Sequence, residues 1–268
     1  MLKRNGTDRR RLTIVLVALL MFAAGLADGV ALQKVVIPDH LFQASPYTYQ
    51  TYTPTNENEA ANKPWPEEIT LNTRKFAPSL KEGTYDTERD SDYTYRQRSL
   101  DLNQTAIIVI DAWAYYPNDG WLKRAQENMS TKLRPLLDLT RYHNMTIIHA
   151  PYGQEIADIV KPLPGEFILD SSNEIDDITE IDRYLQAHHI TTLLYAGYTS
   201  NWCVLNRPTG ILTMYRIGYD IILVRDCTIA FEMPETLDSE TANLVTINLI
   251  ENQFGETTTL EDIKMALQ

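Results

Sequence analysis

The sequence contains very little cysteine. Cys203 and Cys227 are its only two in 268 residues, so a framework of several disulfides is excluded and at most one bridge could form. In the predicted secondary structure one cysteine opens a helix and the other ends a strand, and nothing in this arrangement favours pairing. We therefore treat both as free thiols.

Positive charge is also scarce. The chain has 24 lysines and arginines against 36 aspartates and glutamates, a formal net charge of −12, and no dense basic stretch follows Arg11. Such a chain repels phosphate backbones and anionic lipid headgroups. The composition argues against a nucleic-acid partner.

The amino terminus has the pattern of an export signal. Basic side chains cluster between Lys3 and Arg11, an apolar run extends from Leu12 to Ala27, and small residues suited to cleavage occur up to Ala31. The apolar run is shorter than the ~20 residues that cross a bilayer comfortably. We predict that residues 1–31 are a cleaved signal peptide of a secreted or periplasmic protein; the alternative is an uncleaved anchor formed by residues 12–27, the one predicted contact with a membrane.

Residues 32–102 form a polar segment rich in proline and tyrosine, without a sustained helical or strand period. We predict an amino-terminal extension here and not a separate domain. Tyr47, Tyr49 and Tyr52 resemble an interaction stripe, but an extended arm is the simpler interpretation.

From residue 105 onward, apolar segments of strand length alternate with segments of helical period. This alternation is typical of a parallel sheet, in which each helix returns the chain to the same edge. It predicts an α/β domain over residues 103–268: a three-layer αβα sandwich with a doubly wound, mostly parallel six-stranded sheet of Rossmann-like type. The predicted strands are 106–110, 145–149, 166–169, 192–196, 219–224 and, more weakly, 256–260.

Two segments between the predicted strands have the spacing of amphipathic helices. Met129, Leu133 and Leu137 share one face, and Pro135 is expected to kink that helix. Residues 178–185 repeat the same apolar spacing. Each helix can therefore cover one face of the sheet.

Two residues with useful chemistry follow predicted strands. Asp111 ends the run Ala-Ile-Ile-Val-Ile-Asp, and a buried carboxylate there is costly unless it is capped, paired or used. Cys203 follows the strand that ends at Gly197 and would stand in the first turn of the next helix, where free amides favour the thiolate. The alternatives are a capping aspartate and an inert buried cysteine.

Several motifs together resemble a known family. The stretches Thr105–Asp111, Gly197–Val204 and Gly218–Thr228 resemble, in this order, the isochorismatase-like cysteine hydrolases, a group that includes isochorismatases, nicotinamidases and carbamoylsarcosine amidases. The segment Phe254–Leu260 is similar to the last strand of that family. The resemblance covers residues 103–268 and implies the same αβα fold.

The resemblance implies a mechanism. Asp111 would take the thiol proton and Cys203 would attack the carbonyl of a small amide or related C–N or acyl compound, giving a thioacyl intermediate that water opens. The oxyanion would be held by the backbone N–H groups of Thr199 and Cys203, with a cis peptide bond before Thr199. The family's specificity often involves a neighbouring subunit, so a homo-oligomer is a candidate assembly.

The sequence departs from the family pattern at a third catalytic residue. A lysine is expected at the end of the middle strand, but alignment through Pro164–Leu169 places Ser171 there, and no lysine lies between Lys161 and Lys264. Lys161 is the only nearby substitute, although it precedes the strand. A catalytically silent binding or scaffold protein of the same fold is therefore the alternative to an enzyme, and a redox-responsive thiol protein is a third reading.

No metal or other cofactor is predicted. Some relatives bind a divalent metal through a histidine-rich segment, but no histidine lies between Asp111 and Tyr142, and His188 and His189 point to different sides of a helix. His149 ends a predicted strand and could line the crevice, but we interpret it as a polar residue with its own partners.

The export signal gives a testable prediction. Amino-terminal sequencing of exported protein should show that the chain begins near residue 31, because the basic and apolar regions end at suitable cleavage positions. An intact Met1 in the membrane fraction would replace the signal peptide with an anchor.

Overall fold

The computed structural model describes residues 66–77, 92–169 and 174–267. The predicted signal segment 1–31, Tyr47, Tyr49 and Tyr52 lie outside the described residues. Among the described helices, none is both long enough and apolar enough to span a membrane.

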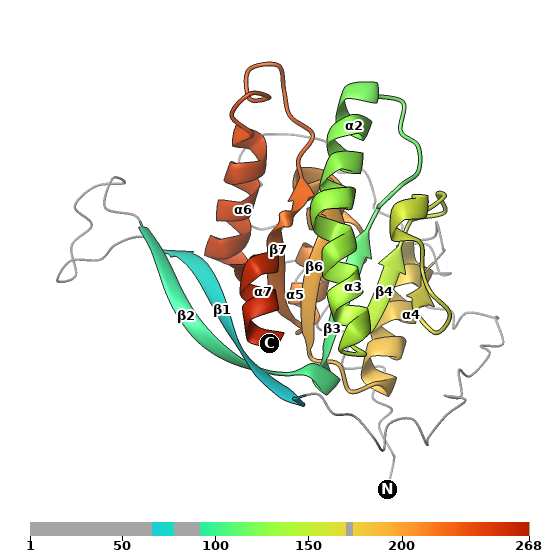
Figure 1. Ribbon diagram of the computed structural model, residues 1–268, viewed down its shortest axis with the longest axis vertical. Coiled ribbons are helices and arrows are strands. Elements are labelled where there is room, and N and C mark those ends of the chain that lie inside the picture. Colours follow the sequence, from blue (N-terminus) through green and yellow to red (C-terminus); the bar gives the residue numbers. More distant parts are fainter. Residues whose placement is uncertain (1–65, 78–91, 170–173, 268) are drawn as a thin grey trace, which may run out of the picture. The chain divides into compact units, whose positions relative to one another are not determined.

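The described residues form one eight-stranded sheet with the order β2-β1-β8-β7-β6-β3-β4-β5 (Figure 1). The six strands from β8 to β5 run parallel, and β1 pairs antiparallel with both β2 and β8. The strands are β1 (Glu68–Ala77), β2 (Asp92–Asp101), β3 (Thr105–Ile110), β4 (Thr146–Ala150), β5 (Phe167–Ile168), β6 (Thr192–Tyr198), β7 (Asp220–Ile229) and β8 (Glu256–Thr258).

Helices cover both faces of the sheet and complete three layers. One core joins the sheet to α2 (Asp119–Asn128), α3 (Arg134–Tyr142) and α7 (Leu260–Leu267). The other core joins it to α4 (Glu174–Ala187), α5 (Ile211–Arg216) and α6 (Thr241–Gln253). Short helical turns complete the described elements: η4 (Leu102–Gln104), η5 (Met129–Leu133), η6 (Asp158–Val160) and η7 (Ser200–Val204). The predicted α/β class, sandwich and doubly wound parallel sheet are confirmed.

The irregularity expected at Pro135 takes the form of a wide turn. Between α2 and α3 the chain continues through the π-helical turn η5, and the Arg134 N–H donates to the carbonyl of Met129. Proline has no N–H and its ring crowds the preceding turn, so a regular α-helical bond is lost here in any case. The predicted apolar face, with Met129, Leu133 and Leu137, is fully buried.

The sequence-based strand count of six is wrong, because residues 32–102 contain two strands. β1 and β2 form an antiparallel hairpin that joins the sheet at β8, with Arg74 opposite Thr257. In β1 only Ile69 and Leu71 bury large apolar side chains, and most of β2 is exposed. An edge hairpin of this kind has no long apolar run, which explains why the segment resembled an unstructured extension.

The site is placed where the winding of the sheet reverses. From β3 the chain proceeds outward to β4 and β5, and then returns to the other side of β3 to build β6, β7 and β8. Strands β3 and β6 are therefore neighbours whose following loops diverge, and ligands bind at such a point in open α/β sheets. Both strands are completely buried.

Gly197 allows β6 to lie close to β3. It has a φ of +114°, and a Cβ atom there would lie 2.0 Å from the carbonyl oxygen of Ile110. Only glycine fits this backbone contact, which joins the end of β6 to the residue immediately before Asp111.

Gly197→Ala should therefore destabilise the protein by more than about 4 kcal/mol, because the new methyl group collides with a buried backbone. Gly218→Ala is the matched control: its φ is +105°, but no atom lies within 4 Å of its Cβ position. The control should cost only the left-handed strain of about 1–2 kcal/mol. Urea denaturation measures both, and equal losses would contradict the close-contact explanation.

Candidate active site

Asp111 follows β3 and is almost completely buried, with 1% of its surface exposed. Its backbone N–H donates to Ala150 at the end of β4 (3.1 Å), and its φ of 45° turns the chain sharply away from the strand. Aspartate is among the few residues that adopt this conformation readily. The carboxylate thus lies at the carboxyl ends of the central strands, as the sequence predicted.

Cys203 lies in the turn η7, immediately after β6. Its side chain is partly buried, whereas that of Cys227 is completely buried. The peptide bond between Tyr198 and Thr199 is cis, as the family resemblance implied. The structure brings Cys203 close enough to Asp111 for the charge of the carboxylate to act on the thiol.

Arg207 is the cation of this site, and sequence reasoning missed it. Its Nε and Nη2 atoms lie 3.0 and 2.9 Å from Oδ2 of Asp111. The guanidinium also lies 3.6 Å from the centre of the Tyr152 ring and 5.7 Å from that of Trp113. Arg207 donates its backbone N–H to the carbonyl of Cys203 (3.0 Å), as residues four apart do in a helix. This four-residue spacing places Arg207 on the same side of the turn as Cys203 and is the sequence signal that could have revealed its role.

Lys161 does not fill the place of the missing lysine. Its ammonium group is exposed to solvent and forms an ion pair with Asp158. Asp111 has Arg207 as its ion-pair partner instead. Lys161 therefore does not take the place of the family's lysine beside Asp111. Ser171 lies outside the described residues.

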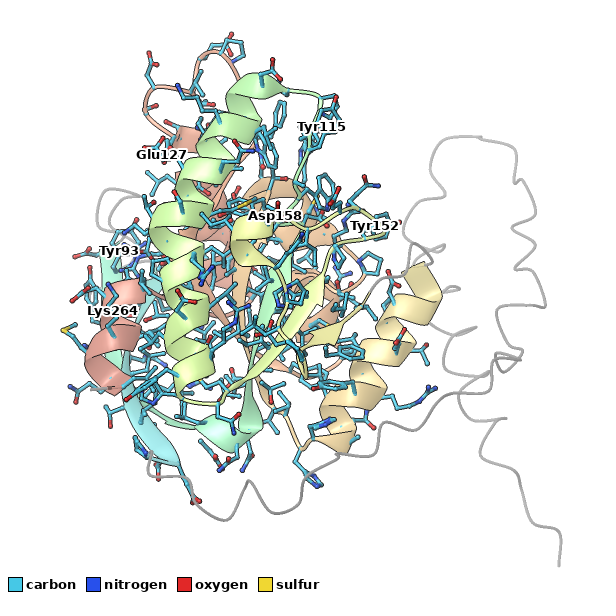
Figure 2. The ribbon with its side chains drawn as sticks, turned by 45° about the vertical axis from the view of Figure 1, so that its right-hand side comes forward. Tyr93, Tyr115, Glu127, Tyr152, Asp158 and Lys264 are labelled. Atoms are coloured by element: carbon cyan, nitrogen blue, oxygen red, sulfur yellow. The ribbon has the colours of Figure 1, made fainter. Side chains whose placement is uncertain are left out.

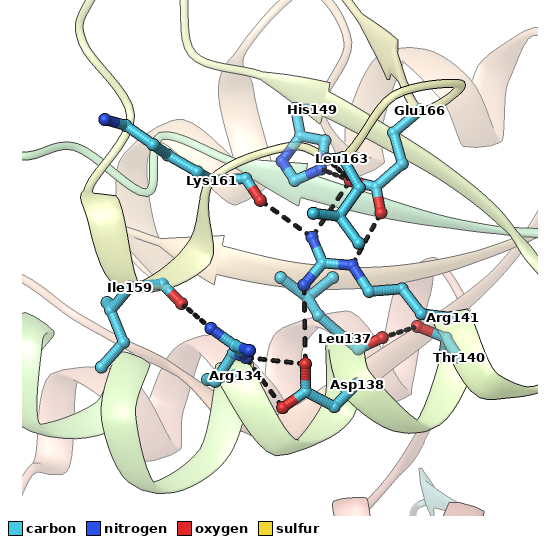
Figure 3. Close-up of polar contacts among 10 residues, drawn as sticks. All are labelled: Arg134, Leu137, Asp138, Thr140, Arg141, His149, Ile159, Lys161, Leu163 and Glu166. Carbon is cyan, nitrogen blue, oxygen red and sulfur yellow. Dashed lines mark hydrogen bonds and ion pairs between the residues drawn. The ribbon is translucent and has the colours of Figure 1, made fainter.

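A buried ionic network holds the loop that carries Lys161 (Figure 3). Arg141 of α3 binds Glu166 through Nε (2.7 Å) and donates through Nη2 to the backbone carbonyl of Lys161 (2.9 Å). His149 Nε2 contacts Glu166 Oε2 at 2.7 Å. Although burial opposes it, hydrogen bonds from His149 and Arg141 lower the pKa of Glu166 to about 2. His149 thus has a structural partner, as expected, and the loop backbone is fixed while the Lys161 ammonium faces solvent.

Backbone hydrogen bonds connect the same loop to the segment that follows Asp111. Ala114 donates its backbone N–H to Glu155 (2.8 Å), and Ala157 donates to Ala112 (2.9 Å). Figure 2 shows Tyr115 and Tyr152 on the loops that follow β3 and β4. The ionic network around Arg141 therefore supports the site by holding the loop backbone, and it contributes no catalytic side chain.

The electrostatics of the pair differ from the prediction for Cys203. Burial raises the pKa of Asp111 to about 6, against the opposing charge of Arg207. Burial, and then the carboxylate of Asp111, raise the pKa of the Cys203 thiol to about 11, against Arg207 and the backbone N–H of Thr199. The predicted lowering of this pKa by a helix terminus is wrong, since η7 is a short turn and the nearest full charge is negative.

This arrangement suits proton transfer during attack better than a preformed thiolate. At neutral pH the resting pair is a thiol beside an ionised carboxylate. Arg207 occupies Oδ2, and Oδ1 is buried and accepts no hydrogen bond among the described residues. Asp111 is thus available as a base for the Cys203 proton.

Aromatic side chains form the surroundings of the pair. Trp202, next to Cys203, stacks on Phe231 with a ring-centre distance of 5.0 Å and is 52% exposed. Trp113, two residues after Asp111, stacks on Tyr116 at 5.8 Å. The loops at both ends of the site therefore present flat apolar faces.

The metal site of some relatives has no counterpart among the residues described. Within residues 66–77, 92–169 and 174–267, no three His, Cys, Asp or Glu side chains converge closely enough to hold an ion.

Comparison with known proteins finds similarity over part of the chain. Residues 147–262 match the isochorismatase domain. Over 179 residues the chain is 24% identical to YrdC, an uncharacterized isochorismatase family protein of Bacillus subtilis (strain 168), covering 59% of this chain and 93% of that protein. Residues 147–262 are therefore similar to an isochorismatase domain.

A solved structure agrees with the fold of residues 92–267. A cysteine hydrolase from Pseudomonas syringae pv. phaseolicola 1448A superposes with a TM-score of 0.51 at 18% identity, covering 63% of this chain and 94% of that one. The match to the isochorismatase domain includes Cys203 and Arg207 but begins after Asp111. The sheet joins Asp111 to that region, because β3 pairs directly with β6.

The charge of Asp111 gives a prediction about thiol reactivity. Alkylation of Cys203 should keep rising above pH 9, because its pKa is about 11, and should exceed that of buried Cys227 throughout. Asp111→Asn should accelerate labelling of Cys203 at pH 8 by roughly tenfold or more, since each unit by which the pKa falls increases the thiolate about tenfold.

Peptide mapping by mass spectrometry assigns the labelled cysteine, and Cys227 serves as the internal control. A labelling rate that levels off near neutral pH in the wild type would contradict the raised pKa. Unchanged labelling in Asp111→Asn would show that the carboxylate does not act on the thiol.

Proposed function

We propose that this chain is a hydrolase of small amides, or of related C–N or acyl compounds, that acts through a thioacyl intermediate on Cys203. The observation that carries the proposal is the cluster of Asp111, Cys203 and Arg207 at the switch point of an isochorismatase-like fold. Acyl transfer uses a nucleophile and a base, and a fixed cation can stabilise the negative charge that forms during the reaction.

The proposed reaction has two steps. Asp111 takes the thiol proton as the sulfur of Cys203 bonds to the substrate carbonyl, and the protonated carboxyl then gives that proton to the leaving amine as the C–N bond breaks. Water next gives a proton to Asp111 and its oxygen bonds to the acyl carbon. The C–S bond breaks, and the sulfur recovers the proton from Asp111.

In this proposal Arg207 supplies the positive charge that the family's lysine would supply. Its contacts with Oδ2 oppose the effect of burial and keep Asp111 largely ionised at neutral pH. Arginine does not lose its proton in proteins, so Arg207 acts as a fixed charge and not as a proton carrier.

The oxyanion would be held by backbone N–H groups of Thr199 and Cys203, as the resemblance implies. The amides of Trp202 and Val204 are not available, because both donate to the carbonyl of Thr199 at 3.2 and 2.9 Å. The hydroxyl of Thr199 is buried and has no hydrogen-bond partner among the described residues. A substrate carbonyl or water near Cys203 would satisfy it.

The surroundings favour a substrate with a flat or apolar group. Trp113 and Trp202 flank the pair, and their ring faces offer contact area without a counter-charge. We further propose that the enzyme needs no cofactor and acts outside the cytoplasm, which is supported by the signal-like residues 1–31.

The roles assigned here predict distinct effects of substitution on hydrolysis of a panel of small amides. Cys203→Ala should abolish turnover, because no other thiol is exposed at the site. Arg207→Gln should lower kcat/KM roughly 10²–10³-fold, and Arg207→Lys should recover part of the loss. Lys161→Ala is the control and should behave as the wild type, because its ammonium group faces solvent.

The pH profile separates these roles. Asp111 accepts a proton only when ionised, so kcat/KM should rise as the pH increases through about 6. Arg207→Gln removes the charge that favours the ionised form, so the rise should move to higher pH. An unmoved profile would contradict the assigned role of Arg207. If the wild type gives neither turnover nor a mass adduct on Cys203 with any amide, ureide or carbamate, the silent binding protein becomes the better reading.

A further inference from the structure

A pocket lies away from Cys203, between the amino-terminal hairpin and the edge of the parallel sheet. Its volume is about 370 Å³. The hairpin supplies most of the wall, and β7 and α7 supply the rest. The lining residues are Asn72, Thr73, Arg74, Tyr95, Arg96, Gln97, Arg225 and Asp262.

The charge of this pocket is opposite to that of the chain. Three of its lining residues are arginines and one is an acid, in a protein with a net charge of −12. The shortness of β8, which has three residues, allows Arg74 of β1 and Arg225 of β7 to approach each other across the sheet. The hairpin therefore supplies the residues that close this sheet edge into a pocket lined by arginines.

Arg225 makes few direct contacts for a guanidinium. It is partly buried, and its one hydrogen bond within the described residues runs from Nη1 to Thr257 Oγ1 (3.1 Å). It forms no ion pair with the carboxylates of the described residues, whereas Arg74 pairs with Glu251 at 2.8 Å. Burial and the nearby charge of Arg74 lower the pKa of Arg225, against the opposing charges of Glu251, Asp262 and Asp226. A half-buried guanidinium with most of its N–H donors unused is stabilised when a further hydrogen-bond acceptor binds to it.

The neighbouring acids bind other partners, but the buried Oε2 of Glu251 has none among the described residues. Glu251 Oε1 binds Arg74 and Thr257. Asp226 binds Lys132 (3.1 Å) and the backbone N–H of Leu260 (2.9 Å). Asp262, the one acid in the wall, accepts from Thr259 Oγ1 (2.6 Å) at the start of α7.

One further polar group of the wall has no partner. Thr73 is 2% exposed, and its hydroxyl makes no hydrogen bond among the described residues. Asn72 and Gln97 add amide donors to the same wall. The amide donors, together with the planar guanidinium groups, match the oxygens of an oxyanion.

We infer that this pocket binds a small oxyanion, a phosphate or a carboxylate, between Arg225 of β7 and Arg74 and Arg96 of the hairpin. The ligand supplies the acceptor that Arg225 lacks and ties the hairpin to the parallel sheet. The volume leaves room for a small organic group on the anion. This site is independent of the thiol chemistry at Cys203.

The test measures anion binding and uses no enzyme assay. Thermal unfolding of the full chain is followed with increasing inorganic phosphate or succinate, against chloride at equal ionic strength. At least one oxyanion should raise the Tm of the wild type in a saturable way. The oxyanion that acts at the lower concentration identifies whether phosphate or carboxylate is preferred.

Three variants locate the site. Arg225→Gln and Arg96→Gln should each weaken the apparent Kd at least tenfold. Arg216→Gln, a substitution of the same kind at an exposed arginine of α5, should leave it unchanged. Hydrogen exchange in residues 68–77 and 92–101 should slow when the wild type is saturated with the oxyanion.

The inference is overturned if neither oxyanion shifts the Tm of the wild type beyond the chloride control. It is also overturned if Arg225→Gln binds as the wild type does. Should Arg225→Gln fail to fold, Arg96→Gln decides, because its side chain is 62% exposed and its loss does not disturb the core. An unchanged Kd in Arg96→Gln would then reject the site.

Discussion

The contact between β3 and β6 is the constraint on which the rest of the site depends. These are the two central strands, both are buried on both faces, and they pair in parallel from Thr105 with Thr192 to Ile110 with Gly197. Because the last pair needs a residue without a side chain, the backbones meet where the two loops separate. The positions of the base and of the sulfur nucleophile thus follow from main-chain geometry.

The balance of charge around Asp111 then determines what chemistry the geometry allows. Burial raises the pKa of Asp111, and the charge of Arg207 lowers it. Even with Arg207 present, the carboxylate of Asp111 raises the pKa of the neighbouring Cys203 thiol. The result is a base with a pKa near the neutral range beside a thiol that stays protonated. The stacking of Arg207 on Tyr152 holds the cation in one orientation, so the balance depends on the loop after β4 as well.

The sequence predicted the elements whose pattern is carried by apolar side chains. Five of the six parallel strands have apolar runs that can be recognised, whereas β8 is Glu-Thr-Thr and was predicted only weakly. The shared edge of these strands brings Asp111 and Cys203 together. The hairpin escaped prediction because its exposed strand is polar. Arg207 escaped because its role depends on the path of the turn after Cys203, which packing fixes. The predicted lowering of the Cys203 pKa was wrong for a similar reason. The sequence indicated that Cys203 starts a helix, but it did not reveal that the thiol is partly buried and lies beside the carboxylate of Asp111.

The hairpin also affects how the protein behaves at high concentration. Without β1 and β2, the exposed edge of the parallel sheet would be β8, a short strand whose three residues, Glu256–Thr258, are buried beneath its neighbours. With them, the outermost strand carries Arg96 and Arg98, whose side chains pair with Glu256 and Asp220 of the sheet. A charged and largely solvated edge is a poor template for a strand from another molecule. The hairpin thus protects the sheet from edge-to-edge aggregation.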